Sequence, residues 1–249
     1  PVNDSVYWLN KAYAQSRNGS WEQALASFNK SLRLDSHYAG AWIGKGYALY
    51  FLGRYQEAAN SFDQAVGIDS ENASAWEGKG LAMMKLGRLK MARLSFDAAL
   101  QREPNNADLW YNQAEVQTRL AEYQDALDSY DRAEKLSSNN TRSMMGKGSI
   151  LMAQGKYQEA ANCYEQIIAN DTINAIAQIA LGEALLELKK HELAEEAFRH
   201  ALTIDPQNFN ASVGLGDALS AQIEPDLAME YYQKALDLNP TSIRALSGK

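Results

Sequence analysis

The sequence predicts an all-α protein, an α-α superhelix in which seven helix-turn-helix repeats stack into a solenoid. Three observations predict this fold. An alanine recurs at one constant interval, an aromatic residue follows each alanine four positions later, and no insertion or deletion breaks the register. The alanines are Ala24, Ala58, Ala92, Ala126, Ala160, Ala194 and Ala228, and the aromatic residues are Phe28, Phe62, Phe96, Tyr130, Tyr164, Phe198 and Tyr232.

Blocks of one constant length that start at Ser5 run without interruption to Ser242. We expect them to form one solenoid domain over residues 5–242, with repeats at 5–38, 39–72, 73–106, 107–140, 141–174, 175–208 and 209–242. Residues 243–249 read like the start of an eighth, truncated repeat. We therefore expect that the chain was taken from a longer repeat protein.

Each repeat begins with a predicted helix that has one apolar face. In the second repeat Trp42, Gly46 and Leu49 recur at intervals of three and four residues, which is the helical spacing. A small polar residue before such a helix can accept a hydrogen bond from a free amide of its first turn. Tyr38 precedes the first helix of the second repeat, and the other repeats have Asp4, Asn72, Asn106, Asn140, Asn174, Asn208 and Ser242 at this place.

A short turn then leads into a second predicted helix. A turn of this kind favours glycine, which tolerates positive φ. Proline cannot continue a helix interior but fits the first position of a helix. We therefore expect Pro225 to start one second helix, and Pro104, Pro206 and Pro240 to follow the ends of three others. The turn residues are Gly19, Gly53, Gly87 and Gly155, with Ala121, Lys189 and Ile223 in the remaining repeats.

Small residues in the first helix predict that it crosses the second helix closely, because a large side chain would force the two helices apart. We expect the aromatic ring of the second helix to fill the space toward the neighbouring repeat. One hairpin cannot bury its apolar face alone, so stacking of repeats supplies the core. The small residues are Gly46, Gly80, Gly148, Gly182 and Gly216, with Ala12 and Ala114 at the same position.

These residues resemble the tetratricopeptide repeat family, whose pattern has an aromatic at position 4, leucine and glycine at 7 and 8, alanine at 20, an aromatic at 24, alanine at 27 and proline at 32. The third repeat follows it with Trp76, Gly80, Ala92, Phe96, Ala99 and Pro104. The last three repeats depart from it at position 4, with Met144, Gln178 and Ser212 in place of tryptophan. The resemblance implies a right-handed superhelix with a concave groove that holds segments of other proteins, and it implies no catalytic activity.

The resemblance also places positions 2, 5, 9, 12 and 13 of the first helices on the concave wall. Their rings could belong to the core instead, but Trp42, Phe62 and similar residues already fill the core positions. A second aromatic stripe therefore predicts a peptide-binding patch with a few charges. The predicted groove residues are Leu9, Tyr13, Arg17, Ile43, Tyr47, Tyr50, Phe51, Leu81, Met84, Lys85, Tyr111, Glu115, Arg119 and Arg142.

Composition and motifs exclude several other classes of function. The net charge of −7 and the isoelectric point near 5.1 argue against a nucleic-acid surface. No apolar run is long enough to span a membrane and no signal peptide is visible, so we expect a cytoplasmic protein. A single cysteine, Cys163, excludes an internal disulfide. The three histidines lack metal-ligand spacing and no phosphate loop is present, so we expect no metal, no cofactor and no catalytic residue.

The sequence thus predicts a non-enzymatic scaffold whose concave face binds an extended or helical segment of a partner protein. Acidic residues on the later part of the wall, such as Glu183 and Glu187, indicate either a basic ligand segment or a solvated acidic face. Two other functions stay open. The chain could associate with itself through its terminal repeats, or it could be the targeting arm of an enzyme encoded elsewhere in a longer protein.

Overall fold

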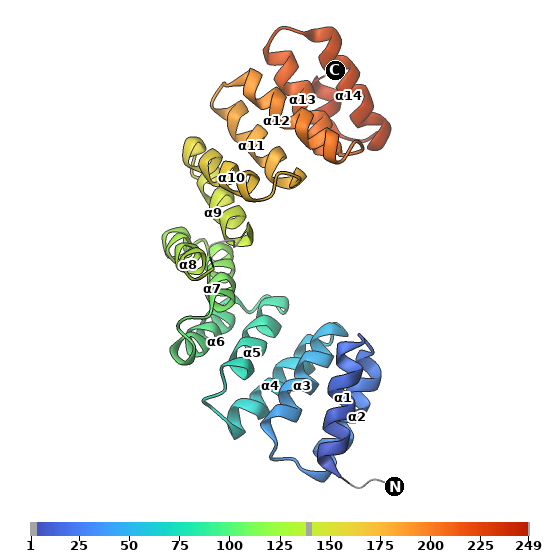
Figure 1. Cartoon of the computed structure of the whole chain (residues 1–249), viewed down its shortest axis with the longest axis vertical. Coiled ribbons are helices and arrows are strands. Elements are labelled where there is room, and N and C mark those ends of the chain that lie inside the picture. Colours follow the sequence, from blue (N-terminus) through green and yellow to red (C-terminus); the bar gives the residue numbers. More distant parts are fainter. Residues whose placement is uncertain (1–3, 138–140, 249) are drawn as a thin grey trace. The chain divides into compact units, whose positions relative to one another are not determined.

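The computed structural model describes residues 4–137 and 141–248, and every regular element in those ranges is a helix (Figure 1). The all-α prediction is confirmed. The first helices of the seven hairpins are α1 (Ser5–Arg17), α3 (Ala39–Phe51), α5 (Ala73–Lys85), α7 (Ala107–Arg119), α9 (Thr141–Ala153), α11 (Ala175–Glu187) and α13 (Phe209–Ala221). The second helices are α2 (Trp21–Leu34), α4 (Tyr55–Ile68), α6 (Leu89–Arg102), α8 (Tyr123–Leu136), α10 (Tyr157–Asn170), α12 (His191–Ile204) and α14 (Pro225–Leu238), and α15 (Ile243–Gly248) follows them.

The hairpins group into two compact units, Pro1–Ser137 and Ser138–Lys249. The first unit contains α1 to α8 and the second contains α9 to α15. In both units the two helices of a hairpin pack against each other, and within a unit a second helix packs against the first helix of the hairpin that follows it there. Each unit is therefore a stack of consecutive helix-turn-helix repeats.

Side-chain caps begin the first helices as predicted. The carboxylate of Asp4 accepts a hydrogen bond from the Val6 amide at 2.9 Å, and the side chain of Asn106 accepts from two amides of α7. Tyr38, the predicted exception, makes no side-chain cap. Asn140 lies outside the described residues. The caps seen elsewhere are those of Asn72, Asn174, Asn208 and Ser242.

The turn inside each hairpin requires a positive φ at one residue, as the sequence predicts. The four glycines at this place have φ between 71° and 75°. Ala121, Lys189 and Ile223 adopt the same conformation, with φ of 61°, 58° and 64°. A side chain in this region costs about 1–2 kcal/mol, and a β-branched residue such as Ile223 is the least suited to it. Three of the seven turns therefore hold local strain.

The core is built around the aromatic ring of each second helix, and three of these rings, Phe62, Phe198 and Tyr232, lie between glycines of two successive first helices. Phe62 of α4 is fully buried. A Cβ atom added to Gly46 of the same hairpin would lie 2.7 Å from the Phe62 ring, and one added to Gly78 of the next hairpin would lie 2.2 Å from it. Phe198 and Tyr232 are held in the same way. Both the predicted close crossing and the predicted reach of the ring toward the next repeat are confirmed.

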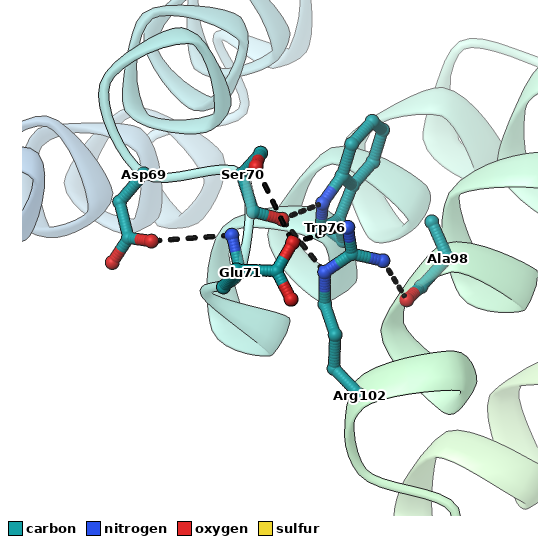
Figure 2. Close-up of polar contacts among 6 residues, drawn as sticks. All are labelled: Asp69, Ser70, Glu71, Trp76, Ala98 and Arg102. Atoms are coloured by element: carbon teal, nitrogen blue, oxygen red, sulfur yellow. Dashed lines mark hydrogen bonds and ion pairs between the residues drawn. The ribbon is translucent and has the colours of Figure 1, made fainter.

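A tryptophan at position 4 links some first helices to the turn that precedes them. Figure 2 shows the indole Nε1 of Trp76 donating to the Ser70 carbonyl, at 2.9 Å. The guanidinium of Arg102 donates to the same carbonyl at 2.6 Å and forms an ion pair with Glu71 at 3.1 Å. The equivalent indole bonds join Trp42 to Ser36 and Trp110 to Pro104.

We expect Gly78→Ala to lower the free energy of unfolding by about 1–3 kcal/mol, because the new methyl group would overlap the Phe62 ring. Gly67→Ala in α4 is the matched control. A Cβ at Gly67 would have no atom within 4 Å beyond its chain neighbours and its own helix backbone, so alanine should raise the free energy of unfolding by about 1 kcal/mol through its helix propensity. Urea unfolding followed by circular dichroism measures both, and equal effects would contradict the wedged-ring arrangement.

Ile223→Gly should raise the free energy of unfolding by about 1 kcal/mol, since it relieves the left-handed conformation of an exposed β-branched residue. The reverse change, Gly53→Ala in the equivalent turn of the second repeat, should lower it by a similar amount. The urea midpoints of the two variants test this pair. A loss of stability in Ile223→Gly would show that the isoleucine side chain contributes more than its backbone conformation costs.

Candidate functional site

The inner side of the first unit is formed by its first helices. α1 contacts α3, α3 contacts α5 and α5 contacts α7, whereas the second helices make no comparable contacts with one another among the described residues. Helices that approach one another on one side of a stack curve it toward that side. The side of the first unit on which α1, α3, α5 and α7 lie is therefore its inner wall.

Two of the tyrosines predicted to line the groove extend the core instead. Tyr47 packs edge-on against Phe62 with ring centroids 5.1 Å apart, and its hydroxyl reaches the Ser74 carbonyl of the next first helix at 3.5 Å. Tyr13 packs on Phe28 at 5.3 Å and donates to the Gly40 carbonyl at 2.9 Å. Burial raises the pKa of the Tyr47 hydroxyl well above its ordinary value, so this hydroxyl stays a donor. Both rings are only partly exposed.

Leu9 was also predicted to line the wall, and this is wrong. Its side chain is 7% exposed and belongs to the core of the first unit, because α2 and α3 pack against α1 and cover it. Three other predicted wall residues are partly buried against the same core: Ile43, Leu81 and Met84. The apolar part of the wall therefore offers less surface than its residue types indicate.

The exposed part of the predicted wall lies in the last turns of four successive first helices. Arg17, Phe51, Lys85 and Arg119 occupy the same repeat position, and we call them the inner strip. The Phe51 side chain is 57% exposed and stacks on Trp21 of the preceding hairpin, with centroids 4.3 Å apart and planes at 16°. None of the described hydrogen bonds or ion pairs includes the side chain of any of the three cations. The strip thus places one supported aromatic ring among uncompensated positive charges.

Tyr50 packs beside the aromatic ring of the strip. Its ring meets Phe51 edge-on at 5.6 Å and Tyr55 at 5.4 Å. Burial raises the pKa of the Tyr50 hydroxyl, and Tyr55 raises it further. Trp21 and Tyr55, which hold these rings, were not predicted. Trp21 starts the second helix of one repeat and Phe51 ends the first helix of the next, and no period of the sequence relates the two.

Acidic groups lie in the earlier turns of the same helices. Burial raises the pKa of the Glu77 carboxyl, with Asp108 and Glu103 adding to the effect, and Asn112 donates to Glu77 at 3.3 Å. Glu115 accepts a hydrogen bond from the Tyr130 hydroxyl. Negative charge thus lies near the starts and middles of α5 and α7, and positive charge lies at their ends. The charge on this wall therefore changes from negative to positive along the axes of α5 and α7.

The remaining predicted residues are Tyr111 and Arg142. Tyr111 is partly buried in α7 and tilts against Tyr130, with ring centroids 6.1 Å apart. Arg142 is exposed in α9, which belongs to the second unit. Arg17, Phe51, Lys85 and Arg119 thus end four successive first helices of the first unit, whereas Arg142 belongs to the second unit.

Across residues 4–137 and 141–248, no group of three His, Cys, Asp or Glu side chains is arranged to hold a metal ion. The Cys163 thiol is buried and forms no disulfide. None of the helices in those ranges combines the length and the apolar character that a membrane span requires.

Two family models of the tetratricopeptide repeat match the chain, one at residues 9–73, 44–106, 77–141 and 145–209 and the other at residues 185–249. No curated protein matches it in sequence. Among solved structures, a tetratricopeptide repeat protein from Parabacteroides merdae is 18% identical with a TM-score of 0.71, over 98% of this chain and 96% of that one. The structure of pilF from Pseudomonas aeruginosa is 17% identical with a TM-score of 0.71, over 84% and 95%.

A third similar structure is YrrB, described as a tetratricopeptide repeat protein with an unusual peptide-binding site. It is 23% identical to this chain, with a TM-score of 0.53, over 88% of this chain and 96% of its own. At these identities the likenesses concern the fold alone.

The wall residues divide into those that support the core and those that are exposed. Tyr47→Ala should lower the free energy of unfolding by about 2 kcal/mol or more, because it empties a place beside Phe62. Phe51→Ala should cost about 1 kcal/mol or less, since this exposed ring loses only its stacking on Trp21 and its edge contact with Tyr50. Chemical denaturation of the two variants tests this order, and a reversed order would contradict the division.

Proposed function

The chain belongs to the tetratricopeptide repeat family, and we propose that it is a non-enzymatic scaffold that binds a segment of a partner protein along the inner strip of its first unit. In this proposal acidic residues of the segment pair with Arg17, Lys85 and Arg119, and an apolar residue packs on Phe51. The observation that carries the proposal is the exposed Phe51 ring between cations that have no partner among the described residues.

The Phe51 ring is suited to anchor a ligand. Its stacking on Trp21 and its edge contact with Tyr50 hold it in one orientation, so little side-chain entropy is lost on binding. A partly exposed aromatic side chain of this kind is typical of binding hot spots. The YrrB structure, described as having a peptide-binding site, supports the idea that a stack of this fold accommodates a peptide.

The strip also defines a spacing for the ligand. First helices of successive hairpins are neighbours, and packed helices lie about 8–10 Å apart. An extended peptide advances about 3.3 Å per residue, so it crosses one helix in about three residues. The matching segment has an acidic residue, an apolar residue three positions later, and acidic residues three and six positions after that. Uncompensated cations would favour this segment by charge complementarity.

This spacing can be tested with the peptide acetyl-Asp-Ser-Gly-Leu-Ser-Gly-Asp-Ser-Gly-Asp-amide, labelled for fluorescence anisotropy. We expect the double variant Lys85→Glu/Arg119→Glu to weaken binding at least tenfold, because it replaces two attractive charges with repulsive ones. Phe51→Ser should weaken it as well, since the leucine loses its contact. A scrambled peptide of the same composition should bind more weakly than the ordered one.

The double variant Arg33→Glu/Lys90→Glu is the matched control, because it makes the same change in net charge at exposed second-helix positions. An equal loss of binding in both double variants would reduce the effect to overall charge and contradict the proposal. Self-association is the rival function, favoured by Ile243 and Leu246, which are 83% and 54% exposed on α15. Light scattering that shows dimers only when these two side chains are present would support the rival.

A further inference from the structure

The second unit has a pocket at the place where the chain departs from its own repeat pattern. Gln178 occupies position 4 of α11, which holds tryptophan in the first four repeats. A pocket of 390 Å³ opens there between α10, α11 and α12. This volume lies in the range of ligand pockets, about 300–1,000 Å³. Its apolar lining consists of Ile168, Ala169, Leu181, Leu185, Leu193 and Ala197.

The repeats that have a tryptophan at position 4 show which surfaces its indole ring borders. Trp110 borders a hollow on the preceding hairpin together with Asp97, Leu100 and Gln101 of α6. The residues at the same repeat positions two repeats later are Glu165, Ile168 and Ala169, and all three line the pocket at Gln178. This half of the pocket is thus the surface that an indole borders elsewhere.

The other half of the pocket matches a hollow on the tryptophan's own hairpin. In the second repeat Trp42 borders a hollow whose lining includes Lys45, Glu57 and Ser61. The residues at the same repeat positions four repeats later are Leu181, Leu193 and Ala197. With glutamine in place of the indole, one pocket is lined by residues from both sets of positions. Three lining positions that hold polar residues in the second repeat thus hold apolar residues in the sixth. Burial of an apolar group there is therefore favourable.

The rim of the pocket carries charge that complements a basic ligand. Glu165 and Glu196 are exposed at its edge, and no ion pair among the described residues includes either of them. His200 is also exposed on the rim. Two acidic side chains beside an apolar floor favour an apolar group that has a cation next to it.

The tryptophan repeats also indicate which apolar group fits. The Trp76 indole lies against its hairpin and donates to the Ser70 carbonyl of the preceding turn (Figure 2). The corresponding turn residue in the sixth repeat is Thr172, which is exposed. We propose that the pocket at Gln178 binds a tryptophan side chain of a partner protein that has a Lys or Arg on each side of it. The ring takes the place of the absent indole, and the flanking cations pair with Glu165 and Glu196.

The test uses the peptide acetyl-Gly-Lys-Trp-Lys-Gly-amide and isothermal titration calorimetry with the full chain. We expect binding to the wild type and at least a tenfold loss in Gln178→Trp, which fills the pocket with the chain's own ring. Leu193→Lys serves as a second variant, since this half-exposed side chain changes without disturbing the core and adds a repulsive charge. Met229→Trp is the control for an added tryptophan, because its site on α14 lies outside the pocket, and it should bind as the wild type does.

The peptide controls separate the ring from the charges. Replacing the tryptophan of the peptide by leucine, or both lysines by glutamates, should weaken binding at least tenfold. The proposal is overturned if the wild type binds no peptide at millimolar concentration, if the leucine peptide binds as tightly, or if Gln178→Trp and Leu193→Lys both keep full affinity. Phe51→Ser should leave this binding unchanged, so failure of the inner-strip proposal does not affect the result.

Discussion

The packing of one aromatic ring between two glycines governs the rest of the structure. Phe62 fits only because Gly46 and Gly78 lack a Cβ atom, and the same wedge recurs at Phe198 and Tyr232. Each of these three rings therefore fixes the distance between its own first helix and the next one. An insertion in one of these repeats would move the ring away from its glycines, which gives a physical reason for the strict register there. The contacts are local, so the stacked units are built from one repeated step.

The fold was predictable from the sequence because its determinants are local and in phase. Caps such as Asn106 and turn residues such as Ile223 meet backbone requirements that recur at the same point of every repeat. How deeply each wall residue is buried was less predictable. Tyr47 shares a helix face with Tyr50, yet its ring packs against Phe62 on the following helix, and the repeat pattern does not indicate this contact. Leu9 likewise lies in the core, which its repeat position does not indicate.

The tryptophan substitutions in the last three repeats illustrate a second limit of the sequence. Met144 and Gln178 both replace the indole, and both are buried. The pocket at Gln178 depends in addition on Leu181, Leu193 and Ala197, whose polar counterparts line the hollow of the second repeat. The sequence shows that the tryptophan is absent. Whether neighbouring side chains fill the space of its ring depends on residues from three helices.

The hydrogen bonds from the indole rings to the preceding turns have a consequence for the order in which the protein unfolds. They join Trp42, Trp76 and Trp110 to their turns in the first unit, and the second unit has no tryptophan. The second unit also contains two of the three strained turns, at Lys189 and Ile223. In a linear array each hairpin is held only by its neighbours, so cooperative opening starts where these ties are fewest. Unfolding should therefore proceed from the second unit, and its amides should exchange hydrogen for deuterium before those of the first.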